Sequence, residues 1–199
     1  MSFLLKKADG GENIVMWKRM GEKPIYEGYR TLVQREYELP SGKVHSYDIV
    51  KGRPVVCALV LDSEGRVVLT RQFRPGPERE VFVLPGGVID PGETPAQAME
   101  RECLEETGYE GRSEFLVSTW AGAYSTTIRH HFIIQNAKPI PQPAIDPDEI
   151  AGVAIMTWDE VWKAVWDGKM MDVETLFLAA SRLSPSVIVP PCVVHEVVT

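Results

Sequence analysis

Three things are scarce in this sequence: cysteine, long apolar runs and positive charge. The three cysteines in 199 residues are an odd number, which does not suggest a disulfide framework. The longest apolar run, residues 55–61, is far shorter than the roughly 20 residues that cross a bilayer. A formal net charge of −7 argues against general nucleic-acid binding, which relies on basic patches. With no signal-peptide pattern at the start, we expect a cytoplasmic protein that binds neither membranes nor nucleic acids.

The composition is otherwise that of an ordinary globular chain. The hydrophobic fraction is 44% and the charged fraction 25%, and the length suits one domain with a small appended element. We divide the chain into an N-terminal β-sheet region at 1–50, a main domain at 51–183 and a tail at 184–199. The proline-rich segment 138–147 is expected to be an irregular loop.

Hydrophobic alternation and turn residues predict a mixture of strands and helices. Residues 25–33 alternate as a strand, and strands at 35–39 and 44–50 flank a turn at 40–43. Further strands are expected at 55–61 and 66–72, which form a hairpin, and at 82–84, 115–120, 129–135 and 151–156. Helices are expected at 95–107, 158–166 and 172–182. This mixture predicts an α/β or α+β sandwich, whose layering stays open at this point.

Two side-chain patterns can be interpreted as sites or as packing. Trp158, Trp162 and Trp166 recur at helical spacing, and core packing is favoured over an aromatic-binding surface. His130 and His131 are neighbours in a strand, so they point to opposite faces of a sheet. We expect one packed and one outward histidine rather than a pocket residue.

The helix at 95–107 has both of its ends specified by local signals. Thr94 is a good N-cap residue, Pro95 suits the first helical position, and Gln97 completes a capping box. Gly108 is placed to end the helix in a left-handed conformation. Ala96, Met99 and Cys103 define the side that should pack inward.

Three glutamates gather on one stripe of this helix. Glu102, Glu105 and Glu106 lie within about one turn, where like charges repel. Clustered carboxylate oxygens suit Mg²⁺ or Mn²⁺, which would turn that repulsion into binding. Arg101 can reach Glu105 one turn along, or Glu93 across the preceding loop. The alternative for the glutamates alone is a solvated acidic face.

The spacing around these glutamates resembles the Nudix box, G-x5-E-x7-R-E-U-x-E-E-x-G-U, in which U is a bulky apolar residue. The fixed positions are all present, as Gly87, Glu93, Arg101, Glu102, Glu105, Glu106 and Gly108. Two U positions depart mildly, because Cys103 and Tyr109 stand where an aliphatic residue is usual. The resemblance makes a solvated acidic face a poor explanation of the segment.

The resemblance implies an α/β/α sandwich around a mixed sheet and a metal-dependent hydrolase that cuts P–O–P linkages. It makes Glu102, Glu105 and Glu106 metal ligands together with the carbonyl of Gly86, and Glu105 and Glu106 catalytic. Mg²⁺ is the expected cofactor, with Mn²⁺ as the alternative. Glu93 and Arg101 are expected to be supporting residues.

Outside the box, roughly over residues 17–180, the chain is similar to the ADP-ribose pyrophosphatase and nucleoside diphosphate-sugar hydrolase branch. The matching pieces are Tyr26-Glu-Gly-Tyr29, Leu39-Pro-Ser-Gly42, Arg71-Gln-Phe-Arg74 and Leu84-Pro-Gly-Gly87. That branch exchanges an N-terminal antiparallel sheet across a homodimer, so a domain-swapped dimer is implied. By position Tyr29 stacks on the base and Arg74 contacts phosphate; strand packing and a surface charge are the alternatives.

The general base of this branch comes from a late acidic loop. Here that loop makes Glu149 the preferred base and Asp148 the second choice, while Glu105 is an alternative inside the box. The loop 120–127 contains no proline, and Thr127 stands near a position where this branch commonly has glutamate. These departures leave a GDP-mannose-type or other nucleoside diphosphate derivative hydrolase as the second choice after ADP-ribose or a related ADP-sugar. A non-catalytic nucleotide sensor is disfavoured because the glutamates are intact.

Overall fold

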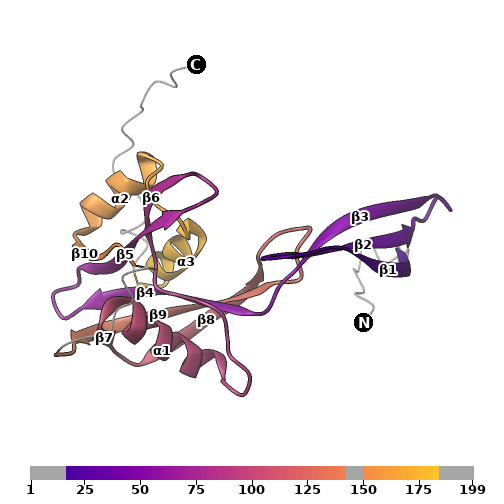
Figure 1. The fold of residues 1–199 in the computed structure, drawn as a ribbon. Helices are drawn as coiled ribbons and strands as arrows, with labels where there is room; N and C mark the ends of the chain where they lie inside the picture. The colour runs from indigo at the N-terminus through magenta and orange to yellow at the C-terminus, as the bar shows by residue number, and fades with distance from the viewer. Residues whose placement is uncertain (1–16, 142–149, 184–199) are drawn as a thin grey trace, which may run out of the picture. The chain divides into compact units, whose positions relative to one another are not determined.

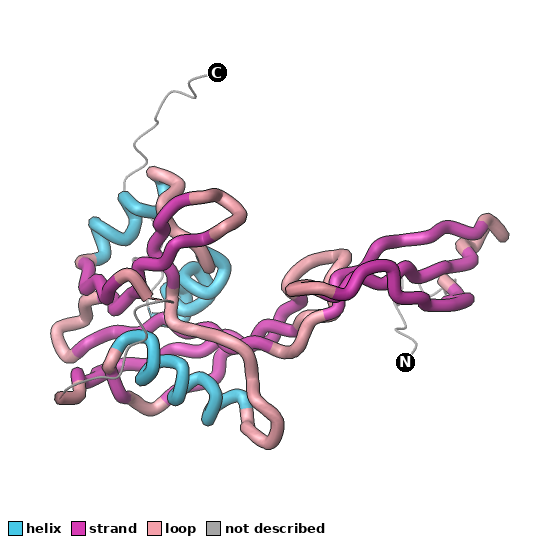
Figure 2. The backbone as a smooth tube through the Cα atoms, viewed as in Figure 1, coloured by secondary structure: helices cyan, strands magenta, loops and turns pink. Residues whose placement is uncertain are grey.

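The computed structural model describes residues 17–141 and 150–183 and shows two compact units (Figures 1 and 2). Within the described residues, one unit holds 17–52 with 120–127, and the other holds 53–119 with the later segments. No helix in the described ranges is long and apolar enough to span a bilayer.

The first unit is a three-stranded antiparallel sheet. Its strands are β1 (Lys18–Glu27), β2 (Thr31–Glu38) and β3 (Val44–Lys51), in the order β1-β2-β3. Segment 120–127 lies along β3, because the Val50 amide donates to the Tyr124 carbonyl and the Thr126 amide donates to the Val50 carbonyl. Aromatic rings collect on this unit, namely Trp17, Tyr37, His45, Tyr47 and Tyr124.

The expected continuous strand at 25–33 is wrong. The chain bends at residues 28–30, which separate β1 from β2. Tyr26 folds back over Gly28, where an added Cβ would lie 2.3 Å from the Tyr26 hydroxyl. Because glycine leaves that space, the bend forms there and interrupts an otherwise strand-like alternation.

The second unit is built on a mixed sheet. Its strands are β4 (Val55–Asp62), β5 (Val67–Arg74), β6 (Arg79–Val83), β7 (Tyr109–Glu110), β8 (Ser113–Trp120), β9 (Ile128–Pro139) and β10 (Gly152–Met156). The order is β10-β5-β4-β9-β7, with β6 paired to β5 and β8 to β9. β4 and β9 run parallel, whereas the other pairs with a recorded register are antiparallel. This parallel pair is what makes the sheet mixed.

Strand β9 is longer than the sequence indicated. It runs through Lys138 and Pro139, which we had placed in an irregular loop, because these residues pair with β7. Proline is tolerated there because the pairing of β9 with β4 ends at Ala137, so the missing amide of Pro139 removes no hydrogen bond from that pair.

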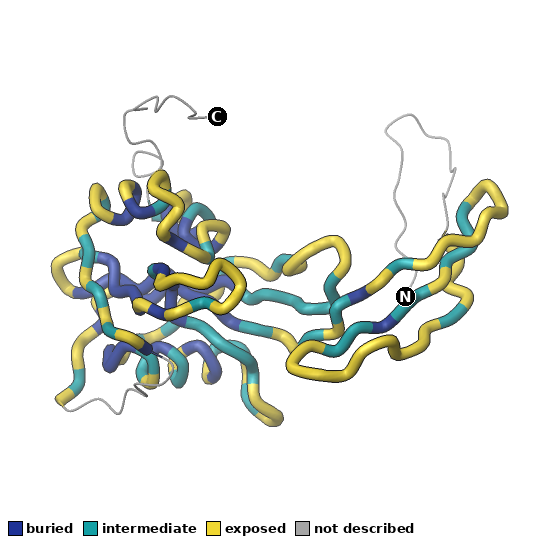
Figure 3. The backbone as a smooth tube through the Cα atoms, turned by 45° about the horizontal axis from the view of Figure 1, so that its top comes forward, coloured by how far each residue is buried: buried dark blue, intermediate teal, exposed yellow. Residues whose placement is uncertain are grey.

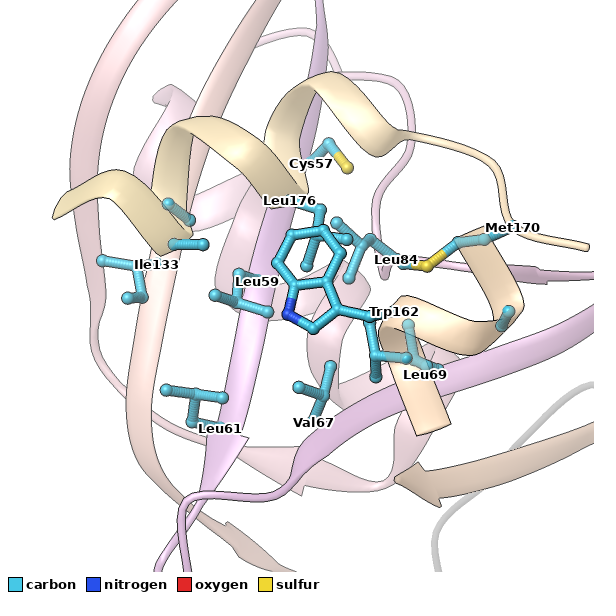
Figure 4. Packing of buried hydrophobic residues seen from close by; sticks show 14 residues of the cluster. Cys57, Leu59, Leu61, Val67, Leu69, Leu84, Ile133, Trp162, Met170 and Leu176 are labelled. Carbon is cyan, nitrogen blue, oxygen red and sulfur yellow. The ribbon is translucent and has the colours of Figure 1, made fainter. Parts of the chain in front are cut away.

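Helices cover both faces of this sheet, which confirms the expected α/β/α sandwich. Alternate β4 residues, Val56, Ala58 and Val60, pack with α1 (Pro95–Thr107). The intervening residues, Cys57, Leu59 and Leu61, pack with α2 (Trp158–Trp166) and α3 (Val173–Leu183), as Figure 4 shows around Trp162. Strand β4 is therefore buried on both faces and forms the centre of the core (Figure 3).

The loop between β6 and α1 lies directly beside β4. Strand β5 pairs with β4 at Val60–Val68 and Leu61–Val67, where the two strands form the expected hairpin. Farther along β4, the Val56 amide donates to the Gly87 carbonyl at 2.9 Å and the Ala58 amide to the Pro85 carbonyl at 3.0 Å. These bonds fix the Gly86–Gly87 turn against the sheet.

The tryptophan and histidine predictions have mixed outcomes. Trp162 is buried and Trp158 packs against the core, but Trp166 is 67% exposed, so the packing prediction is wrong for Trp166. His131 is fully buried, while His130 is only partly buried, as expected for neighbours in a strand.

Candidate active site

Helix α1 has the ends that its sequence predicts. Thr94 and Gln97 form a capping box, and Gly108 ends the helix at φ 70° with its amide donating to the Leu104 carbonyl. Ala98, Met99, Cys103 and Thr107 are the buried side chains. Because both the ends and the inward face are fixed, the directions of the three glutamates are fixed as well.

Glu106 is held beside the glycine turn. Its Oε2 accepts from the Gly86 amide at 2.9 Å, and its Oε1 accepts from the Gln72 amide group at 3.1 Å. Burial raises the pKa of Glu106 to about 7, with a further increase from the charge of Glu102. The hydrogen bonds from Gly86 and Gln72 and the charge of Arg74 act in the opposite direction. A carboxylate so placed is costly to ionise without a nearby cation.

Glu102 occupies the space that the second glycine leaves. A Cβ added at Gly87 would lie 2.4 Å from the Glu102 Oε1. The Glu102 side chain is 15% exposed, and burial raises its pKa even though Arg101 donates a hydrogen bond to it. The turn and the two inward glutamates are therefore fitted to one another.

Glu105 differs from its two neighbours. Its side chain is 57% exposed, and it accepts a hydrogen bond from Arg101 at 3.0 Å. Over residues 17–141 and 150–183, no three His, Cys, Asp or Glu side chains are arranged as a ready metal site. The three glutamates therefore do not converge on one point, because Glu105 is hydrogen-bonded to Arg101 instead.

Arg101 braces the loop against the helix. Its guanidinium bonds both carboxylate oxygens of Glu93, at 2.8 and 2.9 Å, and the Val88 carbonyl at 3.2 Å. The same side chain donates to Glu102 and Glu105. Both contacts expected for Arg101, along the helix and across the loop, are thus confirmed.

The donor set fits a hard divalent cation. Glu102 and Glu106 are neighbouring, partly buried carboxylates, and each has its pKa raised chiefly by burial. The Gly86 amide contacts Glu106, and Glu102 fills the space beside Gly87, so a backbone carbonyl of this turn would add a further oxygen. Oxygen-only donors are what Mg²⁺ and Mn²⁺ prefer, and a cation offsets the cost of burying two like charges.

A small cleft of about 140 Å³ opens beside the turn. It is lined by Val55, Val56, Cys57, Arg74, Val83, Leu84, Gly86, Gly87, Arg129 and Asp172. Arg74 ends β5, and its Nε is buried without a hydrogen-bond partner among the described residues. A guanidinium in that state can donate to a bound anion.

The sequence indicated Arg74 but missed Arg129 and Asp172. These two residues come from β9 and from the start of α3, and neither belongs to a recognisable motif. The one feature that distinguishes Asp172 is its φ of 57°, which is a property of the backbone and has no sequence signal.

The remaining expected site residues are Tyr29, Asp148 and Glu149. Tyr29 is in the bend between β1 and β2, 97% exposed, with the Arg30 guanidinium 5.6 Å from its ring centroid. Asp148 and Glu149, the expected base residues, lie outside the described residues.

Comparison with known proteins matches residues 51–173 to the NUDIX domain family model. The ADP-ribose pyrophosphatase of Bacillus subtilis (strain 168) is 27% identical over 164 residues, covering 80% of this chain and 89% of that protein. The methanol dehydrogenase activator of Bacillus methanolicus is 27% identical over 163 residues, covering 80% and 88%. Mouse (Mus musculus) ADP-sugar pyrophosphatase is 35% identical over 86 residues, covering 38% and 39%.

A solved structure titled as an ADP compounds hydrolase shares the fold. Its TM-score is 0.74 at 20% identity, and the match covers 87% of this chain and 97% of that one. The family match spans the turn, helix α1 and the cleft described above. The chain belongs to the Nudix family and is one of its pyrophosphohydrolases.

Proposed function

We propose that the protein is a Mg²⁺-dependent enzyme that hydrolyses the diphosphate linkage of ADP-ribose or a related nucleoside diphosphate sugar, giving a nucleoside monophosphate and a sugar phosphate. The observation that carries this proposal is the placement of the partly buried Glu102 and Glu106 against the Gly86–Gly87 turn. The named activity of the Bacillus subtilis relative, which aligns with most of the chain, supports the substrate class.

Each proposed role follows from the chemistry of the side chain. Glu102, Glu105, Glu106 and the Gly86 carbonyl are the proposed cation ligands, for which Glu105 must leave its contact with Arg101. A bound divalent cation would lower the pKa of water and offset charge on the phosphate oxygens. Arg74 would donate to phosphate through its guanidinium, whose Nε has no partner among the described residues, and Tyr29 would stack on the base.

We propose Glu149 as the general base that takes the proton of the attacking water, with Glu105 as the alternative. The two assignments separate in a pair of variants, Glu149→Gln and Glu105→Gln. If Glu149 is the base, its variant has a reduced kcat at nearly unchanged cation affinity. If Glu105→Gln alone gives that result, the base lies in α1.

We also propose a cytoplasmic homodimer in which region 1–50 is exchanged between subunits, with 51–183 as the hydrolase domain and 184–199 as a tail. The support is that the three-stranded sheet forms a separate unit. In such a dimer Tyr29 would serve the partner's site.

A substrate panel with product identification tests the proposed function. ADP-ribose, GDP-mannose, other nucleotide sugars, dinucleotides and nucleoside triphosphates are incubated with Mg²⁺, and products are identified by mass. We expect AMP and ribose 5-phosphate from ADP-ribose at the highest kcat/KM. Faster cleavage of GDP-mannose would favour the second substrate class, and tight binding without turnover would indicate a sensor.

A further inference from the structure

An ion pair forms one wall of the cleft beside the glycine turn. The Arg129 Nη1 lies 3.1 Å from the Asp172 Oδ1, and the two side chains are 27% and 15% exposed. Register fixes Arg129 next to Val55, because β9 runs parallel to β4. Asp172 immediately precedes α3, and its carbonyl accepts from the Leu176 amide. Both residues are therefore held by regular structure at the edge of the cleft.

Within the described residues, the Arg129–Asp172 pair makes fewer hydrogen bonds to its surroundings than the Arg66–Asp62 pair of the same unit. Asp62 has its oxygens filled by the Arg66 guanidinium, at 2.8 Å, and by the backbone amides of Glu64 and Arg66. Apart from its contact with Asp172, the Arg129 guanidinium makes no side-chain hydrogen bond to the described residues. A guanidinium has five N–H donors in a planar fork. Most donors of Arg129 thus stay available at the cleft.

The charges on this wall favour an anion. Arg74 and Arg129 both line the cleft, and the charges of both oppose the effect of burial on the pKa of Asp172. Two guanidinium groups and one carboxylate leave one positive charge in excess. The Nε of Arg74 is itself buried without a partner among the described residues. Within the wall Arg129 is paired with Asp172, whereas Arg74 has no carboxylate ion-pair partner among the described residues.

We infer that Arg129 is a second phosphate-binding residue, acting with Arg74 on the diphosphate, and that Asp172 is a positioning residue that holds the Arg129 guanidinium at the cleft. The inference rests on the proposed function for the identity of the anion. Glu102 and Glu106 approach the Gly86–Gly87 turn from α1, whereas Arg74 and Arg129 share the cleft with that turn. The diphosphate would thus meet cation ligands from α1 and arginines from the cleft wall.

Calorimetric binding of inorganic pyrophosphate with Mg²⁺ to the full chain tests Arg129 without needing turnover. A charge-assisted hydrogen bond to phosphate is strong enough that Arg129→Ala should weaken binding about tenfold or more. Arg129→Lys should recover part of the loss, because it restores the charge but not the fork. Arg66→Ala is the matched control: it breaks an Arg–Asp pair outside the cleft and should leave the affinity unchanged.

Steady-state kinetics on ADP-ribose test the positioning role of Asp172. Asp172→Asn should raise KM several-fold with a smaller change in kcat, since it loosens Arg129 without removing it. Circular dichroism of each variant shows whether the fold is kept. The Arg66→Ala control shows how much KM and kcat change when an ion pair outside the cleft is lost.

The outcomes separate this inference from the proposed function. If the wild-type chain cleaves ADP-ribose but Arg129→Ala binds pyrophosphate as tightly as wild type, the inference is wrong and the function stands. If ADP-ribose is not cleaved while pyrophosphate binds and Arg129→Ala weakens it, the substrate is wrong and the inference stands. No binding of pyrophosphate by the wild-type chain overturns the inference.

Discussion

Three glutamates within one helical turn have different surroundings. Glu102 and Glu106 are partly buried beside glycines, and this burial raises the pKa of each. Glu105 points to solvent and contacts Arg101. The difference comes from the sheet and the Gly86–Gly87 turn, which cover one side of the stripe and leave the other open.

Replacing Glu102 or Glu106 by glutamine should stop catalysis without unfolding the protein. Loss of a ligand oxygen should lower kcat/KM for ADP-ribose by roughly 100-fold or more. Stability of the cation-free protein should be kept at pH 8, because Glu106→Gln removes a buried charge. Glu100→Gln, on the exposed side of the same helix, is the control and should retain wild-type turnover. Near-normal rates in both variants would contradict the ligand assignment.

Site residues that lie close together in the sequence could be predicted, whereas site residues that the fold brings together from distant segments could not. The spacing of Glu102 and Glu106 with respect to Gly87 is a sequence property, because one turn and one helix hold all three. Arg129 and Asp172 come together only after α3 packs against β9. No local sequence pattern predicts the contact between these two residues.

At the scale of elements, the two glycines of the turn make room for different neighbours: Gly86 for the backbone of β4, and Gly87 for the side chain of Glu102. A Cβ at Gly86 would lie 2.3 Å from the Val56 carbonyl oxygen, which is backbone and cannot move aside. A Cβ at Gly87 would meet the end of the Glu102 side chain, which can rotate away.

Gly86→Ala should therefore lower stability, whereas Gly87→Ala should weaken the binding of a divalent cation. Gly86→Ala should lower the free energy of unfolding by about 1–3 kcal/mol, the usual cost of overpacking. Gly87→Ala should fold with nearly normal stability but bind Mn²⁺ more weakly, because Glu102 is displaced. Urea unfolding and Mn²⁺ titration separate the two effects; equal losses of stability would show that Glu102 does not fill the space at Gly87.

Elements with local end signals were predicted well, and those set by pairing were not. The helix expected at 95–107 matches α1 because capping residues specify both ends. The β1–β2 bend was missed because it depends on a ring folding over Gly28. The two-residue strand β7 was missed because it exists only through its pairing with β9.

At the scale of the molecule, the layering and the parallel β4–β9 pair could not be worked out from periodicity alone. A run such as 55–61, apolar at every position, indicates burial on both faces but not which helix covers which face. The alternate packing of β4 residues against α1 and against α2 and α3 supplies that answer.

Mixed dimers test the proposed exchange of region 1–50. Tyr29→Ala and Glu106→Gln chains, each of low activity, are unfolded together and refolded as a mixture. If Tyr29 serves the partner's site, one site of each mixed dimer has both residues intact and activity is recovered. If each site is built from one chain, no recovery occurs. A monomer in sedimentation would also contradict the exchange.

Stability should fall in mild acid because of a buried histidine. His131 lies between Thr119 and Thr175, each 2.8 Å from a ring nitrogen, and burial lowers its pKa below the ordinary value of 6.5. As the pH falls through about 6.5, the unfolded chain takes up a proton that the folded imidazole does not, which favours unfolding. Urea unfolding of His131→Gln between pH 8 and 5 should lose less stability than wild type; an identical pH slope would contradict this.

We propose that the partly buried carboxylates Glu102 and Glu106 of α1 hold a divalent cation together with the Gly86–Gly87 turn. Crystals soaked in Mn²⁺ and measured at the manganese absorption edge test it directly. We predict an anomalous peak within coordination distance of Glu102, Glu106 and the Gly86 carbonyl, with Glu105 turned toward it from Arg101. Absence of a peak there, or a peak only at another position, would contradict the account.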